Sequence, residues 1–253
     1  MNVHDSNFNN SKEILLSNNK NTNQTNLNLK NEEEYMSENK SIFLEWNNIN
    51  YKILKSKKNN QVSDNSKIIL NNISGFALPN QILAILGPSG CGKTTLLNVI
   101  SKRQINNLGK DHKIERNVLS NGVDLSGDEF GHLCAYVMQD DVLLSTFTPR
   151  ESLMFAASLK LNLKKEEIKK KVDKLIKQFG LEKCQNTVIG SLENKKISGG
   201  ERKRTSIAYE LISNPSVVFL DEPTTGMDSF TSIVIMKYLK MIAFKGKTIS
   251  KIN

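Results

Sequence analysis

Apolar residues follow two periods along the chain, and each period predicts a different kind of element. Residues 41–54 and 67–86 alternate apolar with polar side chains and are rich in β-branched residues. This pattern predicts antiparallel strands that lead into a buried strand ending at Leu86. Apolar runs predict a strand at residues 133–139 and a second buried strand at residues 217–221. A last strand is expected at residues 247–253. Polar residues near 55–66 predict a loop, and the stretch before residue 133 is expected to be rich in loops.

Helical spacing of apolar residues appears between these strands. It predicts helices over residues 94–103, from Pro149 to about Gln178 and from the Ser198 turn to about Ile212, and another that follows the strand at residues 217–221 and runs to about Phe244. Because strands alternate with helices, the order predicts an α/β core. We expect an inserted helical subdomain at about residues 142–196 and a separate antiparallel β subdomain at the start.

Composition leaves the predicted core unchanged and bears on the N-terminal segment and on the location of the protein. Residues 1–40 contain 12 Asn and few large apolar side chains, so we expect a disordered tail before a domain at residues 41–253. No apolar run approaches the roughly 18 residues that a membrane-spanning helix needs, and no secretory signal opens the chain. The three cysteines lack the spacing of a zinc site. We therefore expect reduced thiols and residence in the cytosol.

The formal net charge is +9, which raises the question of nucleic acid. The lysines cluster between residues 160 and 177, on the face of an amphipathic helix opposite its apolar side chains. No aromatic side chains lie between them to stack on bases. A solvated helix face explains the cluster better, so no nucleic-acid partner is expected.

A glycine-rich loop stands between a predicted strand and a predicted helix. Its residues are Gly87, Pro88, Ser89, Gly90, Cys91, Gly92, Lys93 and Thr94, which fit the pattern G-x-x-x-x-G-K-[ST]. The glycines let backbone N–H groups turn toward a phosphate, Lys93 reaches phosphate oxygens, and Thr94 offers its hydroxyl to Mg²⁺. Cys91 fills a variable position, where a small filler is the favoured role; the alternative is a reactive thiol whose alkylation would block ATP binding.

Two further motifs supply carboxylates and a second anion site. Asp221 and Glu222 end a buried strand, where ligands of open α/β sheets collect. Since successive side chains of a strand point oppositely, Asp221 is expected to hold Mg²⁺ and Glu222 to accept a proton from water. Ser198, Gly199 and Gly200 open a helix, which is another anion-binding start. One anion-binding helix N-terminus serves one nucleotide. The helix N-terminus at Ser198 is therefore expected to face a phosphate held by another molecule; an ordinary Ser N-cap is the simpler alternative.

Together these stretches resemble the nucleotide-binding domain of ATP-binding cassette transporters of the White-type, or G, subfamily. GPSGCGKTTLLNVIS, YVMQDDVLLSTFTPRESLMFAASLKL and ISGGERKRTSIAYELISNPSVVFLDEPTTGMDS carry the resemblance over most of residues 41–250. It implies a P-loop NTPase with a RecA-like core. It implies a Walker A loop from Gly87 to Thr95 and a signature from Ser198 to Glu201. By the same resemblance Gln139 is the Q-loop glutamine at Mg²⁺, Asp221 the Walker B aspartate, Glu222 the catalytic glutamate and Asp228 the D-loop aspartate.

The resemblance also implies how the domain would work. Two cassettes, as a homodimer or heterodimer, would close around two ATP molecules, and hydrolysis would reopen them. The pair would drive the membrane domain of a half transporter at the cytosolic face of a membrane and export lipids, sterols or xenobiotics. The alternatives are an ATP-binding module that pairs with full-length partners without turnover, and a soluble cassette ATPase on ribosomes or DNA.

The sequence departs from the family pattern at two places. The aromatic residue that stacks on adenine in many cassettes would fall at Ile53, with Tyr51 a possible substitute; Tyr51 and Trp46 are expected to be core residues instead. The switch histidine has no counterpart, because His4, His112 and His132 all precede Asp221. We expect slow hydrolysis and a chain truncated before its membrane domain.

Overall fold

The computed structural model describes residues 41–54, 66–103, 111–191 and 194–252. The Asn-rich segment at residues 1–40 and most of the stretch near residues 55–66 lie outside the described residues, so the disordered tail and the polar loop stay predictions.

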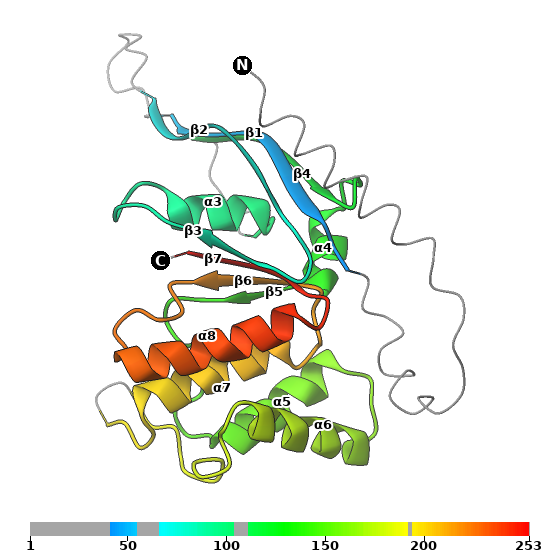
Figure 1. Cartoon of the computed structure of the whole chain (residues 1–253), viewed down its shortest axis with the longest axis vertical. Helices are drawn as coiled ribbons and strands as arrows, with labels where there is room; N and C mark the ends of the chain where they lie inside the picture. Colours follow the sequence, from blue (N-terminus) through cyan, green and yellow to red (C-terminus); the bar gives the residue numbers. More distant parts are fainter. Residues whose placement is uncertain (1–40, 55–65, 104–110, 192–193, 253) are drawn as a thin grey trace. The chain divides into compact units, whose positions relative to one another are not determined.

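A three-stranded antiparallel sheet forms the first layer (Figure 1). It consists of β1 (Leu44–Ile53), β2 (Lys67–Ala77) and β4 (His112–Ser120), in the order β2-β1-β4. The first two strands lie where the alternating pattern predicts them. β4 falls in the stretch that was expected to be rich in loops, and so does α4 (Gly127–Leu133). The expectation was wrong there.

The second sheet is parallel and has four strands. β3 (Ile82–Ile85), β5 (Cys134–Val137), β6 (Val217–Asp221) and β7 (Thr248–Ile252) lie in the order β3-β7-β6-β5. All five residues of β6 are buried, as expected for a parallel strand covered on both faces. The carboxyl ends of these strands share one edge of the sheet, and the predicted catalytic motifs follow three of those ends.

Alternate residues of β6 face two different cores. Val217 and Phe219 join the cluster that includes α3 (Lys93–Ile100) and the antiparallel sheet, while Val218 and Leu220 join the cluster on the opposite face. Helix α3 accordingly lies between the two sheets (Figure 1). This alternation places Asp221, two residues beyond Phe219, on the side of α3.

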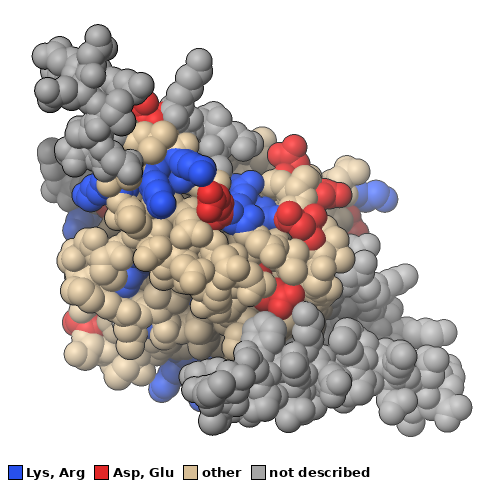
Figure 2. Space-filling view, turned by 90° about the horizontal axis from the view of Figure 1, so that it is seen from above, with Lys and Arg blue, Asp and Glu red and all other residues tan. Residues whose placement is uncertain are grey.

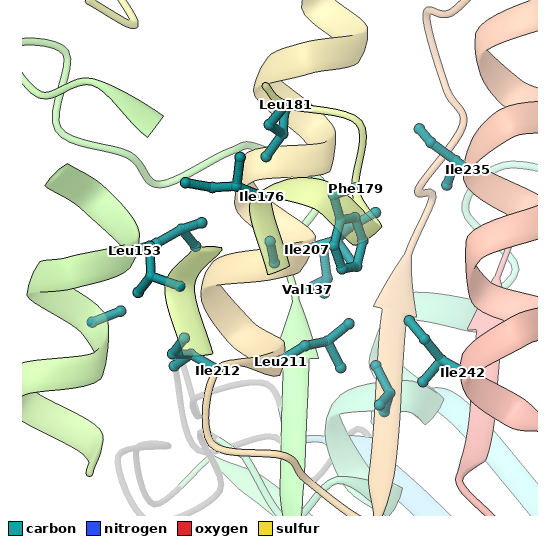
Figure 3. Close-up of a cluster of buried hydrophobic side chains, with 14 of the residues drawn as sticks. Val137, Leu153, Ile176, Phe179, Leu181, Ile207, Leu211, Ile212, Ile235 and Ile242 are labelled. Atoms are coloured by element: carbon teal, nitrogen blue, oxygen red, sulfur yellow. The ribbon is translucent and has the colours of Figure 1, made fainter. Parts of the chain in front are cut away.

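Four helices lie on the other side of the parallel sheet. They are α5 (Pro149–Lys160), α6 (Lys165–Gln178), α7 (Gly199–Leu211) and α8 (Ser229–Ala243). Of these, α7 and α8 contact the strands of the sheet, α5 packs on α7, and α6 packs on α5 (Figure 1). Figure 3 shows the core that they share with the sheet, to which Val137 contributes from β5 together with Leu153, Ile176, Ile207 and Ile242 from the four helices. The stretch from Pro149 to Gln178 is two helices rather than one, because Leu161 adopts an extended conformation and ends α5.

Charged side chains of both signs share the surface seen from above. Figure 2 shows Lys and Arg lying beside Asp and Glu, with much of the remaining surface uncharged. No uninterrupted basic stripe crosses the described part of this face. Within the described ranges, none of the helices combines the length and the apolar character that crossing a bilayer requires.

Candidate active site

The glycine-rich loop connects β3 to α3 and has a backbone that glycine makes possible. Gly90 and Gly92 have φ angles of 78° and 96°, a region that L side chains rarely adopt. A Cβ on Gly87 would lie 2.9 Å from Sγ of Cys91, so the loop packs closely on itself. No side chain caps the start of α3. The amide N–H groups of its first turn therefore remain available to an anion.

Lys93 folds back across this loop. Its Nζ donates hydrogen bonds to the carbonyl oxygens of Gly87, at 2.9 Å, and Pro88, at 3.0 Å. The residue is only 9% exposed. The ammonium group thus lies at the loop itself and retains a third N–H for a further acceptor.

Asp221 is held by hydroxyl groups from two other elements. Its Oδ1 accepts a hydrogen bond from Oγ1 of Thr94 at 3.2 Å, and its Oδ2 accepts one from the Tyr136 hydroxyl at 3.3 Å. Burial raises the pKa of Asp221 above its ordinary value, and the neighbouring Glu222 adds to the rise, although both hydroxyl groups and Lys203 oppose it. The loop and the end of β6 are therefore joined directly.

Glu222 follows β6 and is partly exposed. Its Oε2 accepts hydrogen bonds from Nε2 of Gln139 at 2.9 Å and from Oγ1 of Thr225 at 3.0 Å. Gln139 lies just beyond β5, the strand that pairs with β6. Sheet order thus brings together two residues that are 83 positions apart in the sequence.

The predicted signature begins α7 with a reciprocal cap. Ser198 donates from both its amide nitrogen and its Oγ to Oε2 of Glu201, each at 2.8 Å, and Oγ accepts the Glu201 amide at 3.2 Å. Burial pushes the pKa of Glu201 upward, but these hydrogen bonds, with smaller contributions from Cys184 and Arg204, lower it overall. Ser198 is therefore a helix N-cap, as the simpler alternative expects, and this is compatible with an anion at the same start.

Asp228 lies beside the signature. It caps α8, where Oδ1 accepts the Thr231 amide at 2.9 Å and Oδ2 accepts the Thr231 hydroxyl at 2.7 Å. A Cβ on Gly200 would come within 2.5 Å of Cγ2 of Thr231, so the starts of α7 and α8 are in close contact.

The predicted residues therefore form two clusters. The first contains the loop from Gly87 to Thr95 with Gln139, Asp221 and Glu222; the second contains Ser198 to Glu201 with Asp228. No hydrogen bond between described residues joins the signature to the loop.

The first cluster fits a nucleotide with Mg²⁺. Free amides at a helix start and a lysine ammonium suit phosphate groups. The Thr94 hydroxyl, the Asp221 carboxylate and the Gln139 amide oxygen are the oxygen ligands that Mg²⁺ prefers. These donors belong to three elements that already meet through hydrogen bonds.

Sequence reasoning missed two residues of this site. Tyr136 binds Asp221, and Lys203 donates to the backbone on both sides of Gln139. Tyr136 lies three residues before Gln139, and Lys203 lies in the charged run that follows the signature. Neither position signals its partner, because the contacts depend on the order of the strands.

Comparison with known proteins identifies the family. The profile of the ABC transporter family matches residues 70–225, which is more than half of the chain. The chain belongs to the ABC transporter family. The matched range takes in both the glycine-rich loop and Glu222, so this ABC transporter chain carries the family's ATP-binding domain.

Curated relatives of this ABC transporter chain belong to the G subfamily. The chain is 46% identical over 186 residues to ABC transporter G family member 13 of Arabidopsis thaliana, covering 73% of this chain and 26% of the relative. It is 44% identical to the mouse protein named broad substrate specificity ATP-binding cassette transporter ABCG2, over 72% of this chain and 27% of that one. It is 43% identical to ABC transporter G family member 1 of Dictyostelium discoideum, over 73% of this chain and 23% of that one. The chain thus spans about a quarter of the length of these relatives.

Tyr51, the possible substitute for adenine stacking, and Trp46 lie in the core of the antiparallel sheet in this ABC transporter chain. Trp46 is 3% exposed and Tyr51 is 8% exposed. The hydroxyl of Tyr51 makes a hydrogen bond of 2.7 Å with Nδ1 of His112. Their expected structural role is confirmed.

Proposed function

We propose that the first cluster binds Mg-ATP and hydrolyses it, and that the chain works as the nucleotide-binding half of a G-type exporter. One observation carries the proposal. The hydrogen bonds Thr94 to Asp221 and Gln139 to Glu222 gather the phosphate loop and both carboxylates at one edge of the parallel sheet. Ligands of open α/β sheets bind at that edge.

Binding would use the backbone of the loop and the lysine. The amides from Gly87 to Thr95 and the ammonium of Lys93 would hold the phosphates, and Lys93 would exchange the carbonyls of Gly87 and Pro88 for phosphate oxygens. Thr94, Asp221 and Gln139 would hold Mg²⁺, which neutralises charge on the transferred phosphoryl group when it is bound.

Glu222 is the proposed general base. Both of its hydrogen bonds end on Oε2, so Oε1 can accept a proton from water. Gln139 and Thr225 fix the direction of the carboxylate.

The second cluster supports a role between two cassettes. Because Ser198 to Glu201 begins a helix apart from the phosphate loop, it is free to face the nucleotide of a second copy or of a related cassette, with Asp228 beside it. We further assign about residues 142–196, which contain α5 and α6, to an inserted helical subdomain and the β1, β2 and β4 sheet to an antiparallel subdomain on a RecA-like P-loop core. The membrane domain of a half transporter would supply the path for lipids, sterols or xenobiotics at the cytosolic face of a membrane.

Two substitutions test the proposed chemistry. Lys93→Ala should remove Mg-ATP binding, measured by titration calorimetry, whereas Glu222→Gln should keep binding and abolish phosphate release. Lys247→Met is the matched control, because Lys247 is also a buried lysine but contacts Asn214 and Pro215 instead of the site. Full affinity in Lys93→Ala would refute the proposed nucleotide site. Binding without any hydrolysis that depends on Glu222 would favour an ATP-binding module that does not turn over.

A further inference from the structure

Lys203 is a buried lysine that the proposed chemistry does not use. It lies in α7, two residues after Glu201, and is only 3% exposed. Its Nζ donates to the carbonyl oxygen of Met138 at 3.1 Å, to the carbonyl oxygen of Gln139 at 2.9 Å and to Oδ1 of Asp141 at 2.9 Å. An ammonium group has three N–H donors, so all three are engaged.

The two carbonyl contacts fix the backbone of Gln139. The Met138 carbonyl belongs to the peptide plane before the Gln139 Cα, and the Gln139 carbonyl belongs to the plane after it. When both planes are held, the backbone dihedral angles between them are held as well. The direction of the Cα–Cβ bond follows from those angles. Lys203 therefore sets where the Gln139 side chain points, and that side chain reaches Glu222.

Few other contacts hold this segment. Met138 and Gln139 are exposed and lie beyond the last ladder pair of β5 with β6, which is Val137 with Leu220. Among the described residues, the remaining hydrogen bonds from this pair to other elements are that of Gln139 to Glu222 and a 3.8 Å contact from Arg103 to the Met138 sulfur. The orientation of the segment thus depends chiefly on Lys203.

A buried charge at this position has a physical reason to be kept. Removing an ammonium from water is unfavourable unless a counter-charge and hydrogen bonds replace its hydration. Asp141 supplies the counter-charge with a side chain that is 14% exposed. An apolar side chain of similar size would fill the space without fixing the two carbonyls. The Lys203 ammonium therefore holds the Gln139 backbone in place rather than merely filling space.

We propose that Lys203 is a positioning residue that orients the Gln139 side chain toward the reaction site. It also couples this orientation to the position of α7, the helix that begins at the signature. Helix α7 carries Ser198 at its start and Lys203 in its second turn. A shift of α7, such as an anion at Ser198 would cause, therefore moves the backbone of Gln139. The positioning of Gln139 by Lys203 is a property of the folded chain, while its consequence for Mg-ATP binding rests on the proposed function.

The positioning itself is tested without nucleotide, by hydrogen–deuterium exchange of the full chain. Lys203→Met keeps the length of the side chain and removes its donors. Exchange of the amides in residues 138–143 should rise by about tenfold, the effect of losing a hydrogen bond to a charged group. Peptides from residues 93–100 should exchange as in the wild type. Lys247→Met, the buried-lysine control, should leave residues 138–143 unchanged. Unchanged exchange in Lys203→Met, or an equal rise in both variants, would overturn the inference.

The consequence for the site is tested by a double-mutant cycle on ATP affinity. Gln139→Ala and Lys203→Met should each weaken binding of Mg-ATP by about 10- to 100-fold, the usual effect of losing a metal ligand's support. Both variants should bind ATP in the presence of a chelator as the wild type does. The double variant should bind no more weakly than the weaker single variant, because Lys203 acts through Gln139.

Effects that multiply in the double variant would refute the coupling, since two independent contributions would then be lost. A uniform loss of affinity with and without Mg²⁺ would also refute it and assign Lys203 to general stability. If the wild type itself does not bind ATP, the proposed function fails, and the exchange measurement alone decides whether Lys203 positions Gln139.

Discussion

The contact between the starts of α7 and α8 can be tested by adding a single methyl group. A Cβ on Gly200 would lie 2.5 Å from Cγ2 of Thr231, closer than nonbonded carbon atoms pack. Thr231 cannot turn away freely, because its hydroxyl donates to Asp228 at 2.7 Å and its branched side chain has few rotamers. In Gly200→Ala, either the helices separate or this hydrogen bond breaks.

The expected change in the free energy of unfolding follows from those two outcomes. Inserting a methyl group into a tight contact typically destabilises a protein by about 1–3 kcal/mol. Loss of the hydrogen bond from the Thr231 hydroxyl to Asp228 adds little, because solvent screens this exposed carboxylate. Alanine is favoured over glycine in a helix by up to about 1 kcal/mol, which partly offsets the clash. We expect Gly200→Ala to lower the free energy of unfolding by about 1–2 kcal/mol.

Neighbouring residues supply both a control and a rescue. A Cβ on Gly199 would meet no atom within 4 Å, so Gly199→Ala reports the change in helix propensity alone. Thr231→Ser removes Cγ2 and keeps the hydroxyl, so it should restore most of the stability that Gly200→Ala loses. Urea denaturation of the four variants measures each free energy. Equal stability of Gly199→Ala and Gly200→Ala, or no rescue by Thr231→Ser, would refute the contact.

Three further predictions concern single side chains. Tyr136→Phe removes the hydroxyl that donates to Asp221 and should lower the free energy of unfolding by about 1 kcal/mol, as measured by urea denaturation. Iodoacetamide should modify the exposed Cys91 and block ATP binding, with ATP protecting the thiol, while mass spectrometry should find the buried Cys184 unmodified, since burial raises its pKa to about 11. Burial lowers the pKa of Lys247 to about 8 from 10.5, so the unfolded chain binds more protons between these values. The unfolding free energy of the wild type relative to Lys247→Met should therefore rise from pH 8 to pH 10.5 and stay level below pH 8; a fall over that range would contradict the assigned burial.

Elements with a strong apolar signal could be predicted from the sequence, and those with a weak signal could not. The uninterrupted run at residues 217–221 predicts β6 with its observed bounds, because both faces of that strand are buried. Most residues of β4 are exposed or half-buried, and the sequence HKIERNVLS offers little alternation. Helix α4 has only seven residues and two glycines. Its start is nevertheless marked by the reciprocal cap of Ser126 and Glu129, a signal that the sequence did contain.

The candidate site was predictable where a motif follows the end of a strand. The phosphate-loop motif identifies Thr94, the end of a buried strand identifies Asp221 and Glu222, and the resemblance to the family identifies Gln139. Which of them touch depends on strand order, which periodicity does not determine. The pairing of β5 with β6 brings Gln139 to Glu222. Lys203 reaches the same segment from a helix on one face of the sheet, so its contact depends on packing between layers as well.

Strand alternation explains the direction of Asp221 but not that of Glu222. Asp221 continues the series of Val217 and Phe219 toward α3 and therefore meets Thr94. Glu222 leaves the strand with a φ angle of 45°, which is uncommon for a residue other than glycine. Pro223 follows it, and a proline restricts the residue before it further. Such a conformation persists only where surrounding contacts hold it, and here Gln139 and Thr225 bind the Glu222 carboxylate. The same hydrogen bonds that orient the Glu222 carboxylate thus also hold its backbone. Loss of the Gln139 hydrogen bond would therefore loosen the carboxylate and the backbone together.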